Sequence, residues 1–141
     1  MPEAAQRLAF EDLKAGMRAA FPFAISAEQM RAFEALSGDR NPLHGDADFA
    51  RSRGFEGPVV YGGLLVAQLS RLIGMHLPGR DALWTGLRIQ FLHPLYVGQD
   101  ARVEAEIRHV SEAVRSVELR FSVEAGGLAI AKGTAEVSVR A

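Results

Sequence analysis

At 141 residues, with 48% hydrophobic and 23% charged residues, the chain has the length and composition of one globular domain. We therefore expect a single domain over residues 1–141. The 16 basic and 17 acidic residues nearly cancel, which argues against nucleic acid as a partner. The absence of cysteine excludes disulfides, thiolate metal ligands and a cysteine nucleophile.

Neither a secretion signal nor a membrane segment is expected. Residues 1–16 carry charged side chains and lack the apolar core of a signal peptide. The longest apolar stretch, residues 59–75, is interrupted by Gln68 and Arg71 and is too short to cross a bilayer. We therefore predict a soluble, cytoplasmic protein with no membrane partner.

The front half of the chain has helical patterns. Ser26 and Gln29 have the spacing of a capping box, which begins a helix. Apolar residues then recur at helical spacing, namely Met30, Phe33 and Leu36. Gly38 supplies the stop that commonly ends a helix. These signals predict a helix between Ser26 and Gly38.

Two more helices are expected before residue 76. Asp46 and Asp48 favour a short helix over residues 46–52, because carboxylates stabilise the positive end of the helix dipole. Residues 62–75 are apolar at nearly every position, with Gln68, Ser70 and Arg71 as interruptions. Because a helix that is apolar nearly all round is typical of a core, we expect this one to be buried.

After residue 79 the apolar pattern changes to the alternation of strands. It covers residues 87–91, 102–108, 117–124 and 131–140. One polar and one apolar face indicate an antiparallel sheet that is buried on one side only. The expected fold class is α+β, with a curved sheet wrapped around the helix of residues 62–75. The small residues Ala131, Gly133 and Ala135 are expected to let helix and sheet approach closely.

Residues 37–44 hold the side chains best suited to chemistry. Asp39 and His44 are residue types that transfer protons near neutral pH. Asn41 and Pro42 lie between them and favour a sharp bend, which can direct both side chains at one water-sized volume. Ordinary turn chemistry is the alternative: Asp39 and Asn41 would then bond nearby amides, and His44 would simply be packed.

The same segment resembles the signature of the MaoC-like, or (R)-specific enoyl-CoA hydratase, family. The signature positions are filled by Phe33, Leu36, Ser37, Gly38, Asp39, Asn41, Pro42, Leu43, His44 and Ala50. The order of elements is also similar over most of the chain: an early strand, a helical segment, a central helix and four strands. The resemblance implies the hot-dog fold, in which a curved antiparallel sheet surrounds a long central helix.

The resemblance implies catalytic roles for three residues. Asp39 and His44 match the pair that holds and activates a water molecule. Gly62 matches the glycine whose backbone N–H polarises a thioester carbonyl. An amide at a helix N-terminus suits that role, because it presents a partly positive donor to a developing oxyanion.

Four further residues are implied to bind the substrate or shape its site. Asn41 matches the asparagine that stabilises the loop, and Ser70 falls at a position near the catalytic pair. Tyr61 and Gly63 depart from the common His-Gly-Met pattern of the family, so we expect them to alter the pocket wall and the substrates that fit. Tyr61 also fits the description of a plain, half-buried aromatic residue.

The implied activity is the (R)-specific hydration of trans-2-enoyl thioesters, or the dehydration of 3-hydroxyacyl thioesters, by a hydro-lyase. The substrate would be carried on coenzyme A or on acyl carrier protein, without a cofactor. No spacing of histidines and carboxylates predicts a metal site. Because hot-dog proteins usually pair their sheets, a homodimer is implied. An acyl-CoA thioesterase of the same fold and a non-catalytic acyl-thioester binding subunit stay open as alternatives.

Overall fold

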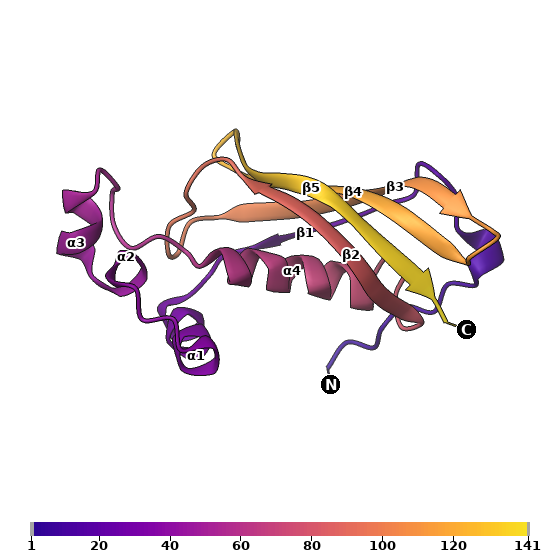
Figure 1. Cartoon of the computed structure of the whole chain (residues 1–141), viewed down its shortest axis with the longest axis horizontal. Helices are drawn as coiled ribbons and strands as arrows, with labels where there is room; N and C mark the ends of the chain where they lie inside the picture. The colour runs from indigo at the N-terminus through magenta and orange to yellow at the C-terminus, as the bar shows by residue number, and fades with distance from the viewer. Residues whose placement is uncertain (1, 141) are drawn as a thin grey trace.

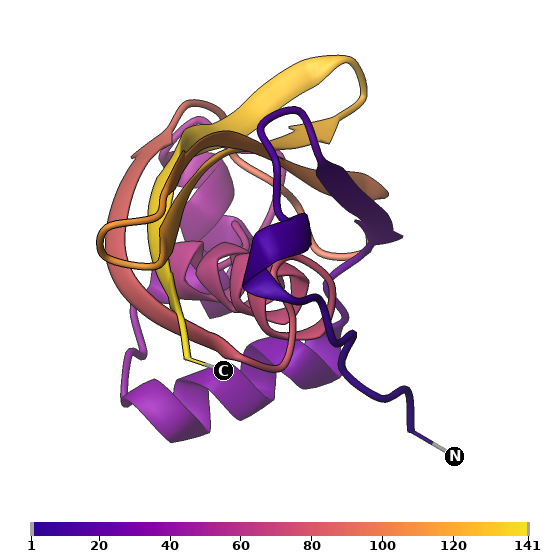
Figure 2. The same cartoon turned by 90° about the vertical axis from the view of Figure 1, so that its right-hand side faces the viewer.

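Five antiparallel strands form one curved sheet around a long helix (Figures 1 and 2). The computed structural model describes residues 2–140. The strands are β1 (Arg18–Phe23), β2 (Ala82–Phe91), β3 (Ala101–Ser111), β4 (Ser116–Ala125) and β5 (Leu128–Val139). Their order across the sheet is β1-β3-β4-β5-β2, so β1 and β2 are the two edges. The predicted α+β arrangement is confirmed.

The long helix α4 (Gly62–Met75) lies inside the curve of the sheet (Figure 2). Its buried residues are Leu65, Leu69, Leu72 and Ile73. On its other side Gly63, Ala67 and Ser70 are exposed. The expectation of a helix buried all round is therefore wrong for the single chain, because the sheet covers only one side. Within residues 2–140, no helix is both long and apolar enough to cross a membrane.

The predicted alternation holds in the central strands β3 and β4. Val103, Ile107 and Leu119 are completely buried on the inner face of the sheet. Burying a side chain of this size stabilises the fold by roughly 1.5–3 kcal/mol, so the inner face is a main source of stability. Gly133 of β5 does permit a close approach, although not of the helix: a Cβ there would overlap the Arg88 carbonyl oxygen of the neighbouring strand.

The edge strand β2 leaves apolar side chains uncovered. Leu87 and Phe91 pair with buried residues of β5, so they lie on the helix-facing side of the sheet. Leu87 is nevertheless 42% exposed and Phe91 53% exposed. No further strand covers this edge within the described chain, so the apolar face of the sheet ends at a side that is open to solvent.

A helical segment joins β1 to α4 and lies beyond one end of the sheet (Figure 1). It contains α1 (Ala27–Ser37), α2 (Pro42–Gly45) and α3 (Ala47–Ser52); a short 3-10 turn, η1 (Phe10–Asp12), precedes β1. The capping box of Ser26 and Gln29 is present, and Gly38 ends α1 with a φ of 74°. Asp46 caps α3 as expected for a short helix there. Leu36, however, is 84% exposed, so its helical spacing does not mark a buried face.

Candidate active site

The turn between α1 and α2 is held by bonds from side chains to nearby backbone groups. Ser37 Oγ accepts the Asp39 N–H at 3.1 Å and donates to the Phe33 carbonyl at 2.7 Å. Asp39 Oδ1 accepts the Asn41 N–H at 3.1 Å, and Asn41 Oδ1 accepts the Leu43 N–H at 3.0 Å. Ordinary turn chemistry therefore does operate at these residues.

The bonds of this turn leave acceptor sites on the Asp39 carboxylate that could bind a water molecule. A carboxylate offers about four acceptor sites on its two oxygens, and the Asn41 N–H occupies one of them. Asp39 is exposed, and within residues 2–140 no hydrogen bond occupies its Oδ2. Asn41 instead uses its Oδ1 to cap α2, which agrees with a role in stabilising the loop.

The imidazole of His44, on α2, is fixed by the chain segment that precedes α4. Its Nδ1 lies 2.6 Å from the Val59 carbonyl oxygen. Because a carbonyl oxygen only accepts, Nδ1 carries the hydrogen, and the neutral ring is left with Nε2 as a proton acceptor. The Val59 N–H also donates to the Leu43 carbonyl at 3.1 Å. Val59 thus holds α2 through both of its backbone polar groups, and the half-buried ring of His44 has a set orientation.

Tyr61 contacts both members of the predicted pair. It is 4% exposed, and its ring stacks on that of His44 with centroids 4.0 Å apart and planes 25° apart. Its hydroxyl donates to the Asp39 carbonyl oxygen at 2.6 Å. Burial raises the pKa of the Tyr61 phenol, and the neighbouring Glu34 and Asp39 carboxylates raise it further. The phenol therefore stays protonated and remains a donor.

Gly62 is the first residue of α4, directly after Tyr61. Amides in the first turn of a helix have no acceptor within the helix, so the Gly62 N–H is available to a ligand. A Cβ at Gly62 would lie 2.9 Å from the ring of Phe91, and a Cβ at Gly63 would overlap the ring of Phe33. The glycine at position 63, where the family commonly has methionine, thus has a physical reason: it leaves room for the Phe33 ring.

Two cavities meet at His44. One, of 370 Å³, lies beside the start of α4 and is lined mainly by apolar residues such as Phe55, Leu65 and Phe91, together with Gly62. The other, of 350 Å³, lies against α1 and is lined by Tyr61, Glu34 and Met30 among others. His44 lines both. The structure therefore brings His44, Tyr61 and Gly62 together around two mainly apolar hollows that share His44.

Some predicted site residues lie outside these cavities. Asp39, Asn41 and Gly63 border neither of them, although Tyr61 ties the Asp39 backbone to the site. Ser70 is exposed on α4, roughly two turns beyond Gly62. Its role near the catalytic pair stays a prediction.

Sequence reasoning missed Val59 and Phe91. The contribution of Val59 is a backbone carbonyl, which has no signature in the sequence. Phe91 fits the apolar alternation of β2 like any inward-facing strand residue. Its approach to Gly62 depends on where β2 ends relative to α4. Its aromatic type at the end of an apolar alternation was the available signal.

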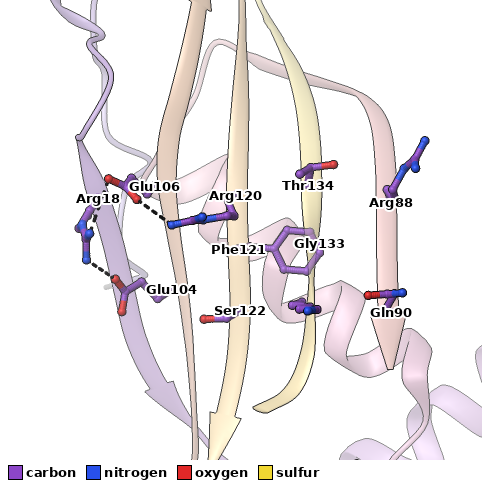
Figure 3. A pocket seen from close by; sticks show the side chains of 11 residues that line it. Arg18, Arg88, Gln90, Glu104, Glu106, Arg120, Phe121, Ser122, Gly133 and Thr134 are labelled. Carbon is purple, nitrogen blue, oxygen red and sulfur yellow. Dashed lines mark hydrogen bonds and ion pairs between the residues drawn. The ribbon is translucent and has the colours of Figure 1, made fainter. Parts of the chain in front are cut away.

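A larger hollow, of 910 Å³, lies elsewhere, on the outer face of the sheet (Figure 3). Ion pairs join Arg18 to Glu104 at 3.0 Å and to Glu106 at 3.6 Å, and Glu106 also pairs with Arg120. These charges form a solvated network across β1, β3 and β4. The sheet separates this hollow from α4, so we place the active site at the smaller cavities around His44. Within residues 2–140, no group of three potential ligands could hold a metal ion.

Two solved structures are similar over nearly the whole chain. An (R)-hydratase from A. caviae involved in PHA biosynthesis is 34% identical, with a TM-score of 0.88, and the match covers 92% of this chain and 98% of that one. An R-hydratase from Pseudomonas aeruginosa, in its unliganded form, is 29% identical, with a TM-score of 0.89 and coverage of 96% and 88%. The class of protein is therefore a hot-dog-fold enzyme, and the predicted fold is confirmed.

Sequence relatives agree with these structures. A sequence profile described as "MaoC like domain" matches residues 10–127. The (R)-specific enoyl-CoA hydratase of Aeromonas caviae is 34% identical over 122 residues, 85% of this chain and 91% of that protein. The 3-hydroxybutyryl-CoA dehydratase of Methylorubrum extorquens is 28% identical over 132 residues, 94% of this chain and 84% of that protein. The chain belongs to the MaoC-like domain family, and the predicted enzyme class, hydro-lyase, is confirmed.

Proposed function

We propose that this chain adds water to trans-2-enoyl thioesters to form (R)-3-hydroxyacyl thioesters, and that it catalyses the reverse dehydration. The names of its hydratase and dehydratase relatives support the reaction and its stereochemistry. The observation that carries the proposal is the setting of His44. Its Nδ1 is bound to the Val59 carbonyl, Nε2 is left to handle protons, and the ring lines the apolar cavity that begins at Gly62.

The thioester would bind with its carbonyl oxygen on the Gly62 N–H. This donor, at the positive end of α4, stabilises the negative charge that develops on the oxygen as an enolate forms. The mainly apolar lining of the 370 Å³ cavity would contact the acyl chain, and a less polar surrounding strengthens that electrostatic interaction. The conjugated double bond is thereby polarised toward attack at C3.

Asp39 and His44 would then handle the protons of one water molecule. Asp39 accepts a proton from the water as the water oxygen attacks C3. That proton then passes to the unprotonated Nε2 of His44, and Nε2 delivers it to C2. The water oxygen ends on C3 with one hydrogen, and the other hydrogen ends on C2. Both side chains return to their starting protonation states, so one turnover consumes one water molecule.

Coenzyme A is the proposed carrier, and acyl carrier protein is the second candidate. The hydratase relatives are named for CoA substrates, whereas a mitochondrial relative from Arabidopsis thaliana, 37% identical over 76 residues, is named for the acyl-carrier-protein form. Because the chain covers 91% of the Aeromonas enzyme and only 45% of the plant protein, we favour coenzyme A.

We also propose a homodimer formed along β2. Exposed sheet edges are commonly paired or covered, and the edge strand β2 leaves Leu87 and Phe91 half exposed on the helix-facing side. A Leu87→Lys variant is expected to halve the mass measured by sedimentation, because a buried ammonium without a partner opposes association. Leu128→Lys, at the exposed leucine that begins β5, is the matched control. A monomeric wild type contradicts this arrangement.

The function is tested with crotonyl-CoA, by following the loss of its enoyl absorbance and the release of free thiol. The wild type is expected to consume the enoyl group without releasing thiol. Asp39→Asn and His44→Ala should each lower kcat/KM by about 10²–10⁴-fold, the usual contribution of a proton-transfer group. The exposed residues Asp48 and His109 provide the matched controls Asp48→Asn and His109→Ala. Full activity in both site variants contradicts the assignment, and thiol release would indicate a thioesterase.

A further inference from the structure

We propose that Tyr61 is a positioning residue that holds His44, the Asp39 turn and the start of α4 in one arrangement. The inference rests on the proposed function, and it assigns Tyr61 a role different from a wall of the substrate pocket. Its basis is that the buried Tyr61 side chain contacts both His44 and the Asp39 turn, and that Tyr61 directly precedes Gly62, where α4 begins. Each contact restricts a different motion.

The stacking contact restricts the tilt of the His44 ring. The hydrogen bond from Nδ1 to the Val59 carbonyl lies in the plane of the ring, so the ring could still rock about that bond. The Tyr61 ring covers one face of the imidazole at a centroid distance of 4.0 Å. An in-plane bond and an out-of-plane stack together fix the direction in which Nε2 points.

The hydroxyl contact anchors the Asp39 turn. The side-chain bonds of Ser37, Asp39 and Asn41 span at most four residues of sequence and are exposed. Such bonds shape the turn without fixing its position relative to α4. The bond from the Tyr61 hydroxyl to the Asp39 carbonyl spans 22 residues, is partly buried and measures 2.6 Å. It therefore ties the turn to the helix that begins at Gly62.

Three further observations agree with a structural donor rather than a proton-transfer group. The Tyr61 carbonyl accepts the Leu64 N–H at 3.0 Å, so a shift of Tyr61 would also shift the first turn of α4. Burial, with Glu34 and Asp39 nearby, raises the pKa of the phenol, which keeps it protonated. Phe33 packs against the ring at 4.7 Å and leaves it little freedom to move.

The test uses Tyr61→Phe, which keeps the stack and removes the hydroxyl, and Tyr61→Leu, which removes both. Steady-state kinetics with crotonyl-CoA should show kcat reduced about ten-fold in Tyr61→Phe, the effect of one hydrogen bond. The reduction should be about 10²-fold in Tyr61→Leu, as expected when reacting groups are misplaced by about 1 Å. KM should stay near the wild-type value in both variants. Tyr96→Phe, which removes the hydroxyl that accepts the Glu56 N–H, is the matched control and should leave kcat unchanged.

A second readout reports on His44 directly. The ¹⁵N chemical shifts of its ring should show a fixed Nδ1–H tautomer in the wild type and in Tyr61→Phe, and an averaged tautomer in Tyr61→Leu. A raised KM with unchanged kcat in Tyr61→Phe would overturn the inference in favour of a substrate contact. Unchanged kcat in the folded Tyr61→Phe variant would overturn it as well. If Asp39→Asn and His44→Ala also keep full activity, the proposed function itself has failed; if only the Tyr61 variants do, this inference alone has failed.

Discussion

The two predicted proton-transfer residues are held in opposite ways. Asp39 is exposed, and its side chain bonds to an amide two residues away. His44 is half buried, and its ring bonds to a carbonyl 15 residues away and stacks on Tyr61. The Asp39 side chain is therefore oriented within its turn by local bonds, whereas the His44 ring is oriented by contacts with distant segments.

This difference indicates which changes each half of the site should tolerate. A turn made of short-range bonds forms wherever its own residues allow it, so its internal geometry depends on Ser37, Asp39 and Asn41. The surroundings of His44 and Gly62 depend instead on how the segment of residues 59–62 meets α2 and β2. Substitutions that disturb the second region should therefore affect activity more than those that loosen the first.

Among the substitutions that change the surroundings of the proton-transfer pair, the largest effect is expected at Gly62. In Gly62→Ala the new Cβ would lie 2.9 Å from the Phe91 ring, so the ring or the helix start must move and the amide donor moves with it. We expect kcat/KM for crotonyl-CoA to fall by about 10²–10³-fold, the cost of losing one oxyanion donor. Steady-state kinetics measure this.

Gly74→Ala is the control for that variant. Nothing lies within 4 Å of a Cβ at Gly74, which is in the same helix. Replacing glycine by alanine inside a helix should stabilise the fold by about 0.5–1 kcal/mol without changing activity. Equal activity of the two alanine variants would show that the Gly62 amide does not bind the thioester.

A smaller effect is expected in the turn. Ser37→Ala removes the oxygen that bonds both the Asp39 N–H and the Phe33 carbonyl, so the Asp39 carboxylate should become less well placed. We expect kcat to fall about ten-fold, the effect of a lost hydrogen bond. Ser52→Ala removes a similar bond, to the Phe49 carbonyl in α3, and should leave kcat unchanged. If both variants keep the wild-type rate, the turn does not need this bond.

The sequence predicted the features that short-range chemistry determines. The capping box at Ser26, the end of α1 at Gly38 and the alternation of β3 and β4 all depend on nearest neighbours along one element. It also predicted a turn in which Asp39 and Asn41 bond nearby amides, and the structure has these bonds; the catalytic role of Asp39 stays a prediction. The remaining features depend on contacts between distant segments. No pattern predicted that the Val59 carbonyl would bind His44, or that Phe33 and Phe91 would press against two glycines.

The contribution of helix α1 to stability can be tested separately from catalysis. Ser26→Ala removes the bond from the Gln29 N–H to Ser26 Oγ and breaks the capping box of α1. The free energy of unfolding, measured with urea, should fall by about 1 kcal/mol. Activity at low denaturant should not change, because Ser26 lines neither cavity and bonds to neither Asp39 nor His44. A large loss of activity would show that the whole of α1 supports the site.

The smallest effect concerns alkaline pH. Since the pKa of Tyr61 is raised above its ordinary value of 10.0, the unfolded chain loses this proton at a lower pH than the folded chain. Below the ordinary pKa of 10.0 this group does not change the free energy of unfolding with pH. As pH rises from that value through the raised pKa of the folded state, the free energy of unfolding falls. Urea unfolding at successive alkaline pH values should show a shallower loss of stability in Tyr61→Phe than in the wild type. Equal slopes would indicate that the phenol is not buried in the folded protein.

In the proposed mechanism, Asp39 and His44 act on the same oxygen atom beside the Gly62 amide. A crystal structure of the Asp39→Asn variant with (R)-3-hydroxybutyryl-CoA tests it directly. We predict that the 3-hydroxyl oxygen lies within about 2.6–3.2 Å of both His44 Nε2 and the side chain at position 39, with the thioester oxygen on the Gly62 N–H. A hydroxyl bound away from His44, or a thioester that leaves the Gly62 amide free, would contradict the account.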